Sequence, residues 1–348
     1  MEESGPQKTG RVTLKQIAHS AGVSLSTASL VLSGKAAERR ISASAARRVR
    51  EVAHQLDYAP NLLVRSIRHG RTNIFSLYSS FQNRERGDLY MDRISSAIER
   101  AAGRLHYDVL VHCDFTRPIN EIYNALNGGR ADGLIFFGPT EGDPLVERLR
   151  SSRLPTVLLN HADETGKISS VREDMHDGMR QVGDELIRLG HRRIAAISGG
   201  PWSDADARIS VLRTRLALDG ISVPDRWVIP VIERDTDCAE KALRFLLSEP
   251  EPPTALFCWH DRVGYFLLDA CERLGIAVPE QLSLIGYDGL HWPSASPHVL
   301  NSVAVDMDTL AESAVYLLDN IVQKKVIPPV SELYPVTLSP GTTLAPPR

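Results

Sequence analysis

The sequence predicts an N-terminal all-α domain of the helix-turn-helix type, followed by a larger α/β domain with two lobes built on parallel sheets. Short helical patterns fill residues 13–58, and a strand-then-helix alternation begins after Thr72. The charge is also divided between the two parts. Residues 1–73 contain twelve Lys or Arg and five Asp or Glu, whereas the remaining residues contain 28 and 38. A basic N-terminal part on an acidic body indicates a polyanionic partner for the first part alone.

Residues 1–60 contain three short helical patterns. Thr13 with Gln16 forms a capping box, and Ser24 and Ser42 are positioned to cap the second and third helices. A glycine separates the first two helices, which is helix-turn-helix organisation. Apolar residues at helical spacing predict the buried faces: Leu14, Ile17, Ala18 and Ala21; Ala28, Val31 and Leu32; Ala46, Val49, Ala53 and Leu56.

Residues 61–71 are the predicted connection between the two domains. Pro60 ends the helical domain, and residues 61–70 can form one short helix followed by a break. A helix of about eight residues is shorter than the roughly 12–15 residues at which an isolated helix holds in water. We therefore expect this connection to be ordered only with a partner.

Residues 72–348 alternate between strand-like and helical patterns. Strand-like apolar runs begin near Ile74, Val109, Leu134, Val157, Ile194, Ala255 and Leu284. Helical stretches lie at about 90–104, 118–127, 143–150, 175–189, 205–219, 237–248, 261–274 and 307–323. This alternation implies parallel sheets covered by helices. About 270 residues exceed one hydrophobic core, so two α/β lobes are expected.

The composition disfavours several classes of protein. The N-terminus lacks the apolar core of a secretory signal, and no apolar run approaches the ~20 residues of a membrane helix. The four cysteines have no C-x-x-C spacing and are expected to be reduced thiols in a cytoplasmic protein. Phosphate-loop, zinc-protease and nucleophile-elbow motifs are absent, and the eleven histidines lack metal-ligand spacing. We therefore expect no enzymatic activity, no cofactor and no metal.

The second predicted helix has an outer face suited to DNA. Ser26, Ser29 and Leu30 point away from the buried set on a helical wheel, and Leu25 lies at the flank. Such a face can enter a major groove, where Leu30 can contact a thymine methyl; an ordinary surface leucine is the alternative. The cations around this unit are expected to contact phosphates: Lys15, Arg39, Arg40, Arg47, Arg48 and Arg50.

Motifs in a fixed order connect both domains to one family. Residues 12–34 resemble the opening of LacI/GalR (lactose-repressor type) transcription regulators, and the likeness continues through residues 41–42, 47–49, 56–61 and 65–66. The body resembles the periplasmic-binding-protein-like sensor of these repressors. Its clearest marks are residues 190–194, 199–201 and 285–288.

The resemblance implies a sequence-specific DNA-binding repressor with a hinge helix at residues 61–71. In this family the hinge helix binds the minor groove, and Ile67 falls at the position of an apolar wedge between base pairs. The DNA-binding residues implied are Thr13, Lys15, Ser24, Leu25, Ser26, Thr27, Ser29, Leu30, Asn61, Val64, Arg65, Ile67 and Arg68. Two features depart from the family pattern. Leu30 replaces a commoner polar or cationic reader, and the β-branched Val64 and Ile67 slightly lower helix propensity.

The resemblance also implies an effector domain over residues 72–348, whose small polar effector, a sugar or a sugar acid, binds between the lobes. Ligands of doubly wound sheets bind outside the carboxyl ends of the strands. The effector-binding residues expected there are Ser79, Tyr90, Asp177, Arg208, Arg234, His260 and Asp288, with Asp174 and Asp261 as further candidates. Two arginines in one cavity favour an effector with an acidic group unless the aspartates neutralise them. The chain is expected to cross between lobes near 170–174, 303–307 and 326–332.

Two other functions are compatible with parts of the sequence. A solute-binding protein of a transporter would share the body, but the basic helical domain and the missing signal sequence disfavour it. A regulator that answers to a protein partner instead of a metabolite is the other possibility, which Arg208 and Asp288 disfavour. No tetramerising heptad follows Pro340, so we expect a homodimer that binds a palindromic operator.

Overall fold

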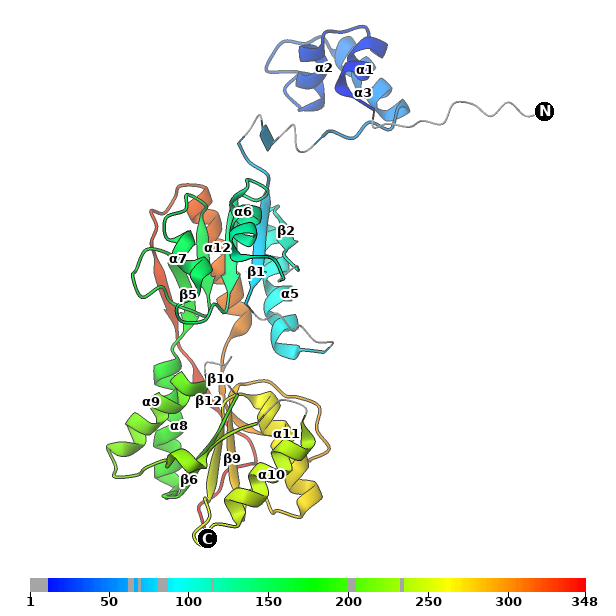
Figure 1. Ribbon diagram of the computed structural model, residues 1–348. Coiled ribbons are helices and arrows are strands. Elements are labelled where there is room, and N and C mark those ends of the chain that lie inside the picture. The colour runs from blue at the N-terminus through cyan, green and yellow to red at the C-terminus, as the bar shows by residue number, and fades with distance from the viewer. Residues whose placement is uncertain are drawn as a thin grey trace, which may run out of the picture. The chain divides into compact units, whose positions relative to one another are not determined.

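The structure is a computed structural model that describes residues 12–61, 66–67, 70–80, 87–113, 116–199, 205–231 and 235–348. The chain divides into two compact units, Met1–Thr72 and Asn73–Arg348 (Figure 1). The predicted fold class, a helix-turn-helix domain followed by a two-lobed α/β domain with parallel sheets, is confirmed.

The first unit contains α1 (Leu14–Ser20), α2 (Leu25–Leu32) and α3 (Ala43–Gln55). The Thr13 hydroxyl accepts the Gln16 N–H at 3.3 Å and the Gln16 carboxamide oxygen accepts the Thr13 N–H at 2.7 Å, so the predicted capping box is present. Ser24 and Ser42 cap α2 and α3. The small core holds the predicted apolar faces, including Ile17, Ala18, Ala21, Ala28, Val31, Ala46, Val49 and Ala53.

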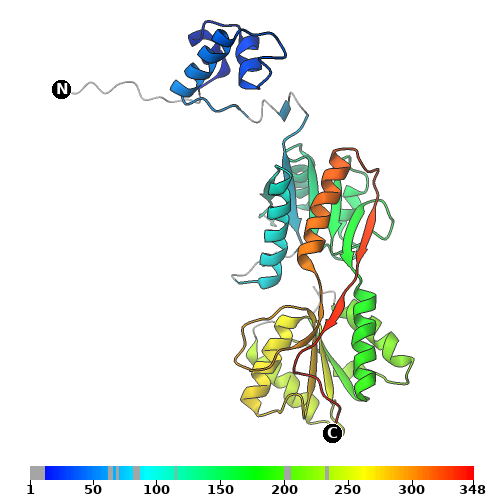
Figure 2. The same cartoon turned by 180° about the vertical axis from the view of Figure 1, so that it is seen from behind.

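The first lobe of the second unit is built on a six-stranded sheet in the order β11-β5-β4-β3-β1-β2, with all strands parallel. The strands are β1 (Ile74–Ser79), β2 (Asp108–Val111), β3 (Gly133–Phe137), β4 (Thr156–Leu159), β5 (Ser169–Glu173) and β11 (Ser331–Tyr334). Helices α5 (Leu89–Arg104) and α12 (Met307–Val322) pack side by side on one face (Figure 2). Helices α6 (Ile119–Asn127) and α7 (Pro144–Leu149) cover the other.

Both faces of this sheet are buried, and the side chains of β3 divide between two cores. Ile135 and Phe137 pack with α5 and α12, whereas Leu134 and Phe136 pack with α6 and α7. Alternate residues of a strand point to opposite faces, so a strand covered on both sides must be apolar throughout. This is why the sequence shows a continuous apolar run at β3.

The second lobe has a six-stranded sheet in the order β12-β10-β9-β8-β6-β7, parallel except for β12, which is antiparallel to β10. The strands are β6 (Ile194–Ser198), β7 (Val228–Pro230), β8 (Ala255–Cys258), β9 (Ser283–Asp288), β10 (Asn301–Ala304) and β12 (Thr337–Ser339). Helices α8 (Met175–Leu189) and α9 (Ala205–Ala217) pack together, as do α10 (Thr236–Leu247) and α11 (Asp261–Leu274). A 3-10 turn spans Asp225–Trp227.

Three crossings connect the lobes. The chain passes from β5 to α8 at Asp174, from β10 to α12 through Val305 and Asp306, and from β11 to β12 through residues 335–336. The third crossing therefore lies just after the range of 326–332 near which it was expected. Residues 331–334 first form β11, a four-residue edge strand of the first sheet with two exposed side chains, which is too short and too polar to give an apolar run.

Candidate functional site

The outer face of α2 is accessible, as the helical wheel predicts. Leu25 is 53% exposed and Ser26 is also exposed, whereas Ala28 and Val31 on the opposite face are buried. Leu30 is half-buried, although the helical wheel places it on the outer face. The side chains at the start of α2 are therefore accessible to a partner.

Hydroxyl groups gather at the N-terminus of α2. The Ser24 hydroxyl accepts the Thr27 N–H at 3.0 Å, and it also lies 2.9 Å from the Ser26 hydroxyl and 2.8 Å from the Thr27 hydroxyl. None of α1, α2 and α3 has an acidic residue in its first turn. Uncompensated N–H groups and the helix dipole favour anions at a helix N-terminus. The N-terminus of α2 is therefore suited to phosphate, while Ser24 itself is a structural cap.

The remaining predicted DNA-binding residues differ in exposure, and Ser29 of α2 is half-buried. Lys15 and Asn61 are exposed, and the Ile67 side chain is 84% exposed. Covering an exposed aliphatic side chain of this size with a partner removes apolar surface from water, which is favourable in free energy. The predicted residues Val64, Arg65 and Arg68 lie outside the described residues.

Arg208 is the centre of a buried charged group in the second unit, which we call the Arg208 cluster: Glu173, Arg208, Trp259, Tyr287 and Asp288. The Arg208 side chain lies 3.9 Å from a Glu173 carboxylate oxygen and 3.8 Å from an Asp288 carboxylate oxygen. It donates to the carbonyl of Trp259 at 2.6 Å, and its guanidinium lies 3.8 Å from the centroid of the Tyr287 ring. Arg208, Glu173 and Asp288 are all buried. Because β5 belongs to the first lobe and α9 and β9 to the second, this cluster joins the two lobes.

His260 lies beside the Arg208 cluster and has a structural role of its own. Its Nδ1 accepts the Val263 N–H at 3.4 Å and thereby caps α11. Its ring meets the Trp259 ring edge to face, with centroids 3.9 Å apart. The indole nitrogen of Trp259 is buried and has no hydrogen-bond partner in the described part of the chain. A buried donor without a partner is costly, which marks Trp259 as a candidate ligand contact.

Ser79 and Tyr90 are the predicted effector residues of the first lobe, and Asn160 contacts Tyr90. Ser79 is buried at the end of β1, and the Tyr90 hydroxyl accepts from the Asn160 side-chain amide at 2.9 Å. Asn160 directly follows β4 in a left-handed conformation with φ of 64°. Its buried carboxamide oxygen has no partner among the described residues, so it can accept a hydrogen bond from a ligand.

Sequence reasoning missed Asn160, Glu173 and Trp259. Each of them ends or directly follows a strand, as the predicted site residues do. The strand-end rule that pointed to Asp288 could therefore have found Asn160 and Trp259. Glu173 could not be found in that way, since β5 is too polar to be recognised as a strand.

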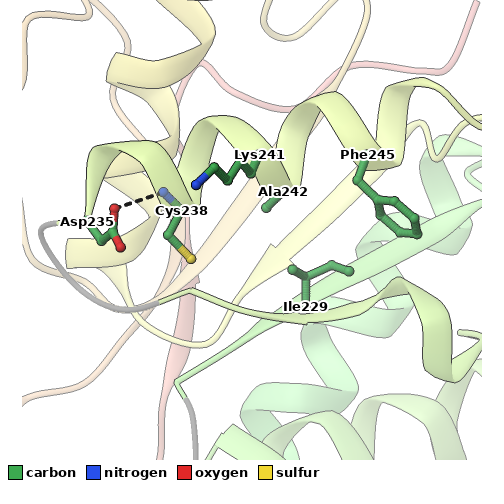
Figure 3. A pocket seen from close by; sticks show the side chains of 6 residues that line it. All are labelled: Ile229, Asp235, Cys238, Lys241, Ala242 and Phe245. Atoms are coloured by element: carbon green, nitrogen blue, oxygen red, sulfur yellow. Dashed lines mark hydrogen bonds between the residues drawn. The ribbon is translucent and has the colours of Figure 1, made fainter.

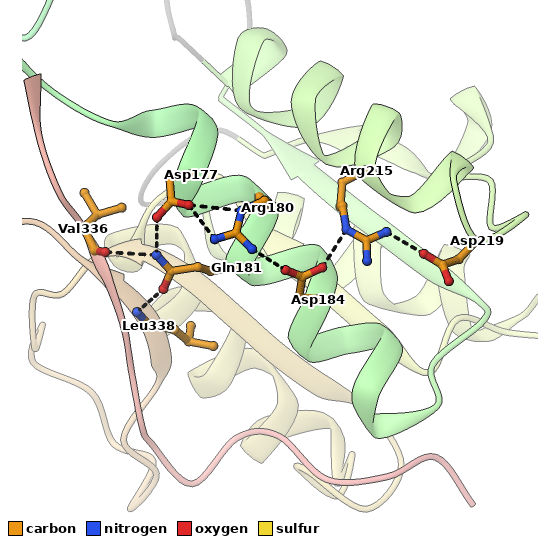
Figure 4. A network of polar contacts seen from close by, with 8 residues as sticks. All are labelled: Asp177, Arg180, Gln181, Asp184, Arg215, Asp219, Val336 and Leu338. Atoms are coloured by element: carbon orange, nitrogen blue, oxygen red, sulfur yellow. Dashed lines mark hydrogen bonds and ion pairs between the residues drawn. The ribbon is translucent and has the colours of Figure 1, made fainter.

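Asp177 is held in different contacts from the Arg208 cluster (Figure 4). Its carboxylate accepts from Arg180 at 2.6 Å and from the Gln181 side-chain amide at 2.7 Å, and the Arg180 hydrogen bond lowers the pKa of Asp177. Gln181 also donates to the Val336 carbonyl at 3.0 Å and accepts the Leu338 N–H at 2.8 Å. Asp177 therefore supports the tie between α8 and the third crossing. The network continues through Asp184, Arg215 and Asp219. Arg234, the remaining predicted effector residue, lies outside the described residues.

Two pockets lie away from these residues. One of about 310 Å³ opens between β7 and α10 and is lined by Ile229, Asp235, Cys238, Lys241, Ala242 and Phe245 (Figure 3). A small polar one of about 30 Å³ lies beside α7, around Asp143 and His161. Neither is lined by any of the predicted effector residues that the structure describes. Among the residues that the structure describes, no group of three or more His, Cys, Asp or Glu could hold a metal ion.

Comparison with known proteins places both units in one family. A family model described as bacterial regulatory proteins, lacI family, matches residues 13–61, and a model of the periplasmic binding protein-like domain matches residues 184–344. The chain belongs to the LacI family. The family resemblance seen in the sequence is therefore confirmed, and this LacI-family protein is a transcription regulator.

The relatives of this LacI-family protein match it over nearly its whole length. Catabolite control protein A of Priestia megaterium is 26% identical over 91% of this chain and 94% of the relative. The transcriptional repressor PurR of Escherichia coli O139:H28 is 26% identical over 93% of this chain and 94% of the relative.

Solved structures share the fold. A Lac repressor dimer bound to operator and the anti-inducer ONPF has a TM-score of 0.80 and 24% identity, covering 96% of this chain and 99% of the other. A complex of the transcriptional regulator CelR with cellobiose has a TM-score of 0.68 and 23% identity, covering 96% and 100%. No helix in the described ranges of this chain is long and apolar enough to cross a membrane.

Proposed function

We propose that this LacI-family protein is a sequence-specific repressor whose operator affinity is controlled by a small polar effector held at the Arg208 cluster. The observation that carries the proposal is the combination, in one chain, of an accessible α2 face and a buried guanidinium between carboxylates from two lobes. The relatives named above are a control protein and a repressor, which supports the same function.

The protein acts as a homodimer on a palindromic operator in the cytoplasm, and it carries out no catalysis. The Lac repressor dimer bound to operator, whose fold this chain shares, supports the dimeric mode of binding. A two-fold dimer presents two copies of α2, and these match two half-sites related by the same symmetry. α2 enters the major groove, and Leu25, Ser26 and Leu30 contact base edges.

The effector is a neutral polyhydroxylated compound. Arg208 lies within 4 Å of two carboxylates, Glu173 and Asp288, so its positive charge is already balanced. Carboxylates accept hydrogen bonds from ligand hydroxyls, and a guanidinium donates to ligand oxygens. The acidic effector favoured by the sequence required a second guanidinium, that of Arg234, which lies outside the described residues. The cellobiose complex of CelR supports a neutral ligand for this fold.

Selection of bound duplexes from a random DNA pool tests the DNA-binding half of this proposal. With the full-length protein, we expect a palindromic consensus whose two half-sites are related by two-fold symmetry. A selected pool without enriched sequence would overturn sequence-specific binding. Calorimetric titration with cellobiose, D-galactose and D-glucuronate tests the effector half, and tighter binding of the uronate than of the neutral sugars would overturn the neutral class.

A further inference from the structure

Asp261, named above as a further candidate, is a buried carboxylate that has had no role in the site so far. It is the first residue of α11, and the residue is fully buried. Its carboxylate accepts the Leu290 N–H at 2.6 Å and the Ser302 hydroxyl at 2.6 Å, and the backbone of Gly289 donates to it as well. Three donors from one loop and one strand therefore converge on this single carboxylate.

Two of these donors belong to the loop that begins after Asp288, the carboxylate beside Arg208. Gly289 and Leu290 follow Asp288 directly, and the Gly289 N–H also lies 3.1 Å from the Ser302 hydroxyl. Asp288 has φ of 107°, a left-handed backbone conformation that residues with a side chain rarely adopt. Such a conformation persists only where the surrounding contacts hold it. The hydrogen bonds to Asp261 are contacts of this kind.

The backbone of Asp288 also reaches the second crossing between the lobes. Its carbonyl accepts the Val305 N–H at 3.2 Å, and Val305 follows β10 directly. The side chain of Asp288 meanwhile lies 3.8 Å from Arg208. One residue thus contacts both the charged cluster and the chain segment that links the lobes.

We propose that Asp261 is a positioning residue of the effector site, which fixes the backbone of Asp288 so that its side chain faces Arg208 and its carbonyl binds Val305. The inference rests on the proposed function, in which Asp288 contacts the effector. Gly286 is part of the same arrangement, because a Cβ at this position would lie 2.2 Å from the Asp261 carboxylate. A residue larger than glycine therefore does not fit at position 286 beside the Asp261 carboxylate.

The positioning role of Asp261 should depend on pH, because it depends on whether the carboxylate is ionised. Burial raises the pKa of Asp261 to about 7, although the Ser302, Leu290 and Gly289 hydrogen bonds and the Arg208 charge lower it. The charge of Asp261 also acts on the titratable groups of Cys258 and Tyr265. The ionised carboxylate can accept all three hydrogen bonds, whereas a protonated one presents a proton to one of the donors. Asp288 is therefore held best when Asp261 is ionised.

Hydrogen exchange of the full-length protein tests this inference without an effector. We expect Asp261→Asn to accelerate amide exchange at Leu290 and Val305 at least tenfold. Asp269→Asn is the matched control. Asp269 lies on the same helix and accepts from the Ser294 hydroxyl and the Ala295 N–H, at 2.6 and 2.7 Å. That control should change exchange at residues 294–296 only. Unaltered exchange at Leu290 and Val305 in Asp261→Asn would overturn the inference.

A pH profile separates positioning from a general structural role. Cellobiose, D-galactose and D-glucose are titrated calorimetrically into the wild type, and the tightest ligand is the probe. We expect wild-type affinity to fall at least fivefold from pH 8 to pH 6, Asp269→Asn to keep that profile, and Asp261→Asn to be weaker at pH 8 and flat. A wild-type profile in Asp261→Asn would contradict the inference. Failure of all three sugars to bind would contradict the neutral effector class instead, and hydrogen exchange would still decide the role of Asp261.

Discussion

Ser24 is a predicted DNA contact that also has a structural role in α2. A change at such a residue cannot be assigned to DNA recognition alone. The Ser24 hydroxyl is engaged as the N-cap of α2, so its substitution would destabilise the helix before it changed recognition. Leu25 and Leu30 have no such task, although Leu30 is only partly accessible. Sequence specificity is read from base edges, so these two leucines are the positions at which specificity can be altered.

Leu30→Arg should change the sequence that is bound more than the strength of DNA binding in general. An arginine forms a bidentate pair with guanine, whereas leucine can only contact a thymine methyl, and one good pair is worth about 1–3 kcal/mol of discrimination. Selection from a random pool with both proteins measures the change. An identical consensus would show that Leu30 does not face the bases.

Asp288→Asn and Arg208→Ala should each weaken effector binding at least tenfold while operator affinity without effector is retained. Loss of one member leaves a buried polar partner unsatisfied, at a cost of about 1–3 kcal/mol. Arg213→Ala is the matched control, because Arg213 lies on the same helix and pairs with the exposed Asp225. Calorimetry with the probe sugar measures the effect. Equal losses in all three variants would indicate damage to α9 and not to the site.

The sequence predicted helices better than strands, and the reason lies in how each element is buried. Every α-helix that the structure describes in the second unit was found, since each has one apolar stripe and most have a clear cap. Strands β5, β7, β10, β11 and β12 were missed. β5 is buried but reads Ser-Ser-Val-Arg-Glu, and β11 is a half-exposed edge strand. Short strands of this kind are paired by distant segments, which no local pattern reveals.

The loop between β4 and β5 is held by one carboxylate, that of Asp163. Its oxygens accept the N–H groups of Thr165, Lys167 and Ile168, and it pairs with Arg150. Burial alone would raise the pKa of Asp163. Hydrogen bonds from the Thr165 hydroxyl, the Lys167 and Thr165 N–H groups and the Arg150 side chain outweigh burial and lower the pKa to about 2. The loop is therefore stabilised by the ionised form.

Asp163→Asn should reduce stability at pH 7 by about 1–2 kcal/mol, since one pKa unit corresponds to about 1.4 kcal/mol. The folded-state pKa lies below the unfolded value, so this stabilisation is present above pH 4 and is lost as the pH falls toward 2. Thermal unfolding of both proteins as a function of pH measures the difference. A difference that stays constant from pH 7 to pH 2 would show that ionisation of Asp163 is not its source.

At the scale of the whole molecule, the first unit is basic and the body is acidic, and this difference determines which part binds DNA. Lys15 is exposed on the basic unit, whereas the body carries an excess of acidic residues that DNA repels. We expect operator affinity to fall steeply with salt, by a logarithmic slope of about 0.9 per phosphate contact. Lys15→Gln should reduce that slope by about one and weaken binding to all sequences alike. Filter-binding titrations over a range of salt concentrations measure it. A slope unchanged by the substitution would remove Lys15 from the phosphate contacts.

The position of the Arg208 cluster could be predicted only in part at this scale. Asp288 and Arg208 lie in recognisable motifs, but Glu173 reaches Arg208 only because the chain crosses between lobes directly after β5. Contacts made by such a crossing depend on the packing of two sheets. Arg208 and Asp288 lie 35 and 115 positions after Glu173 in the sequence, so no local pattern predicts these contacts.

The three crossings also determine when each lobe can be completed during synthesis. The first lobe needs α12 and β11 in addition to residues 74–173, and the second lobe needs β12. A ribosome that has made residues 1–306 has therefore delivered neither lobe in full, and both acquire their last strand within the final twenty residues or so of the chain. Neither lobe corresponds to one continuous stretch of the gene. A single crossover between residues 174 and 306 would consequently divide both lobes between the two parent sequences.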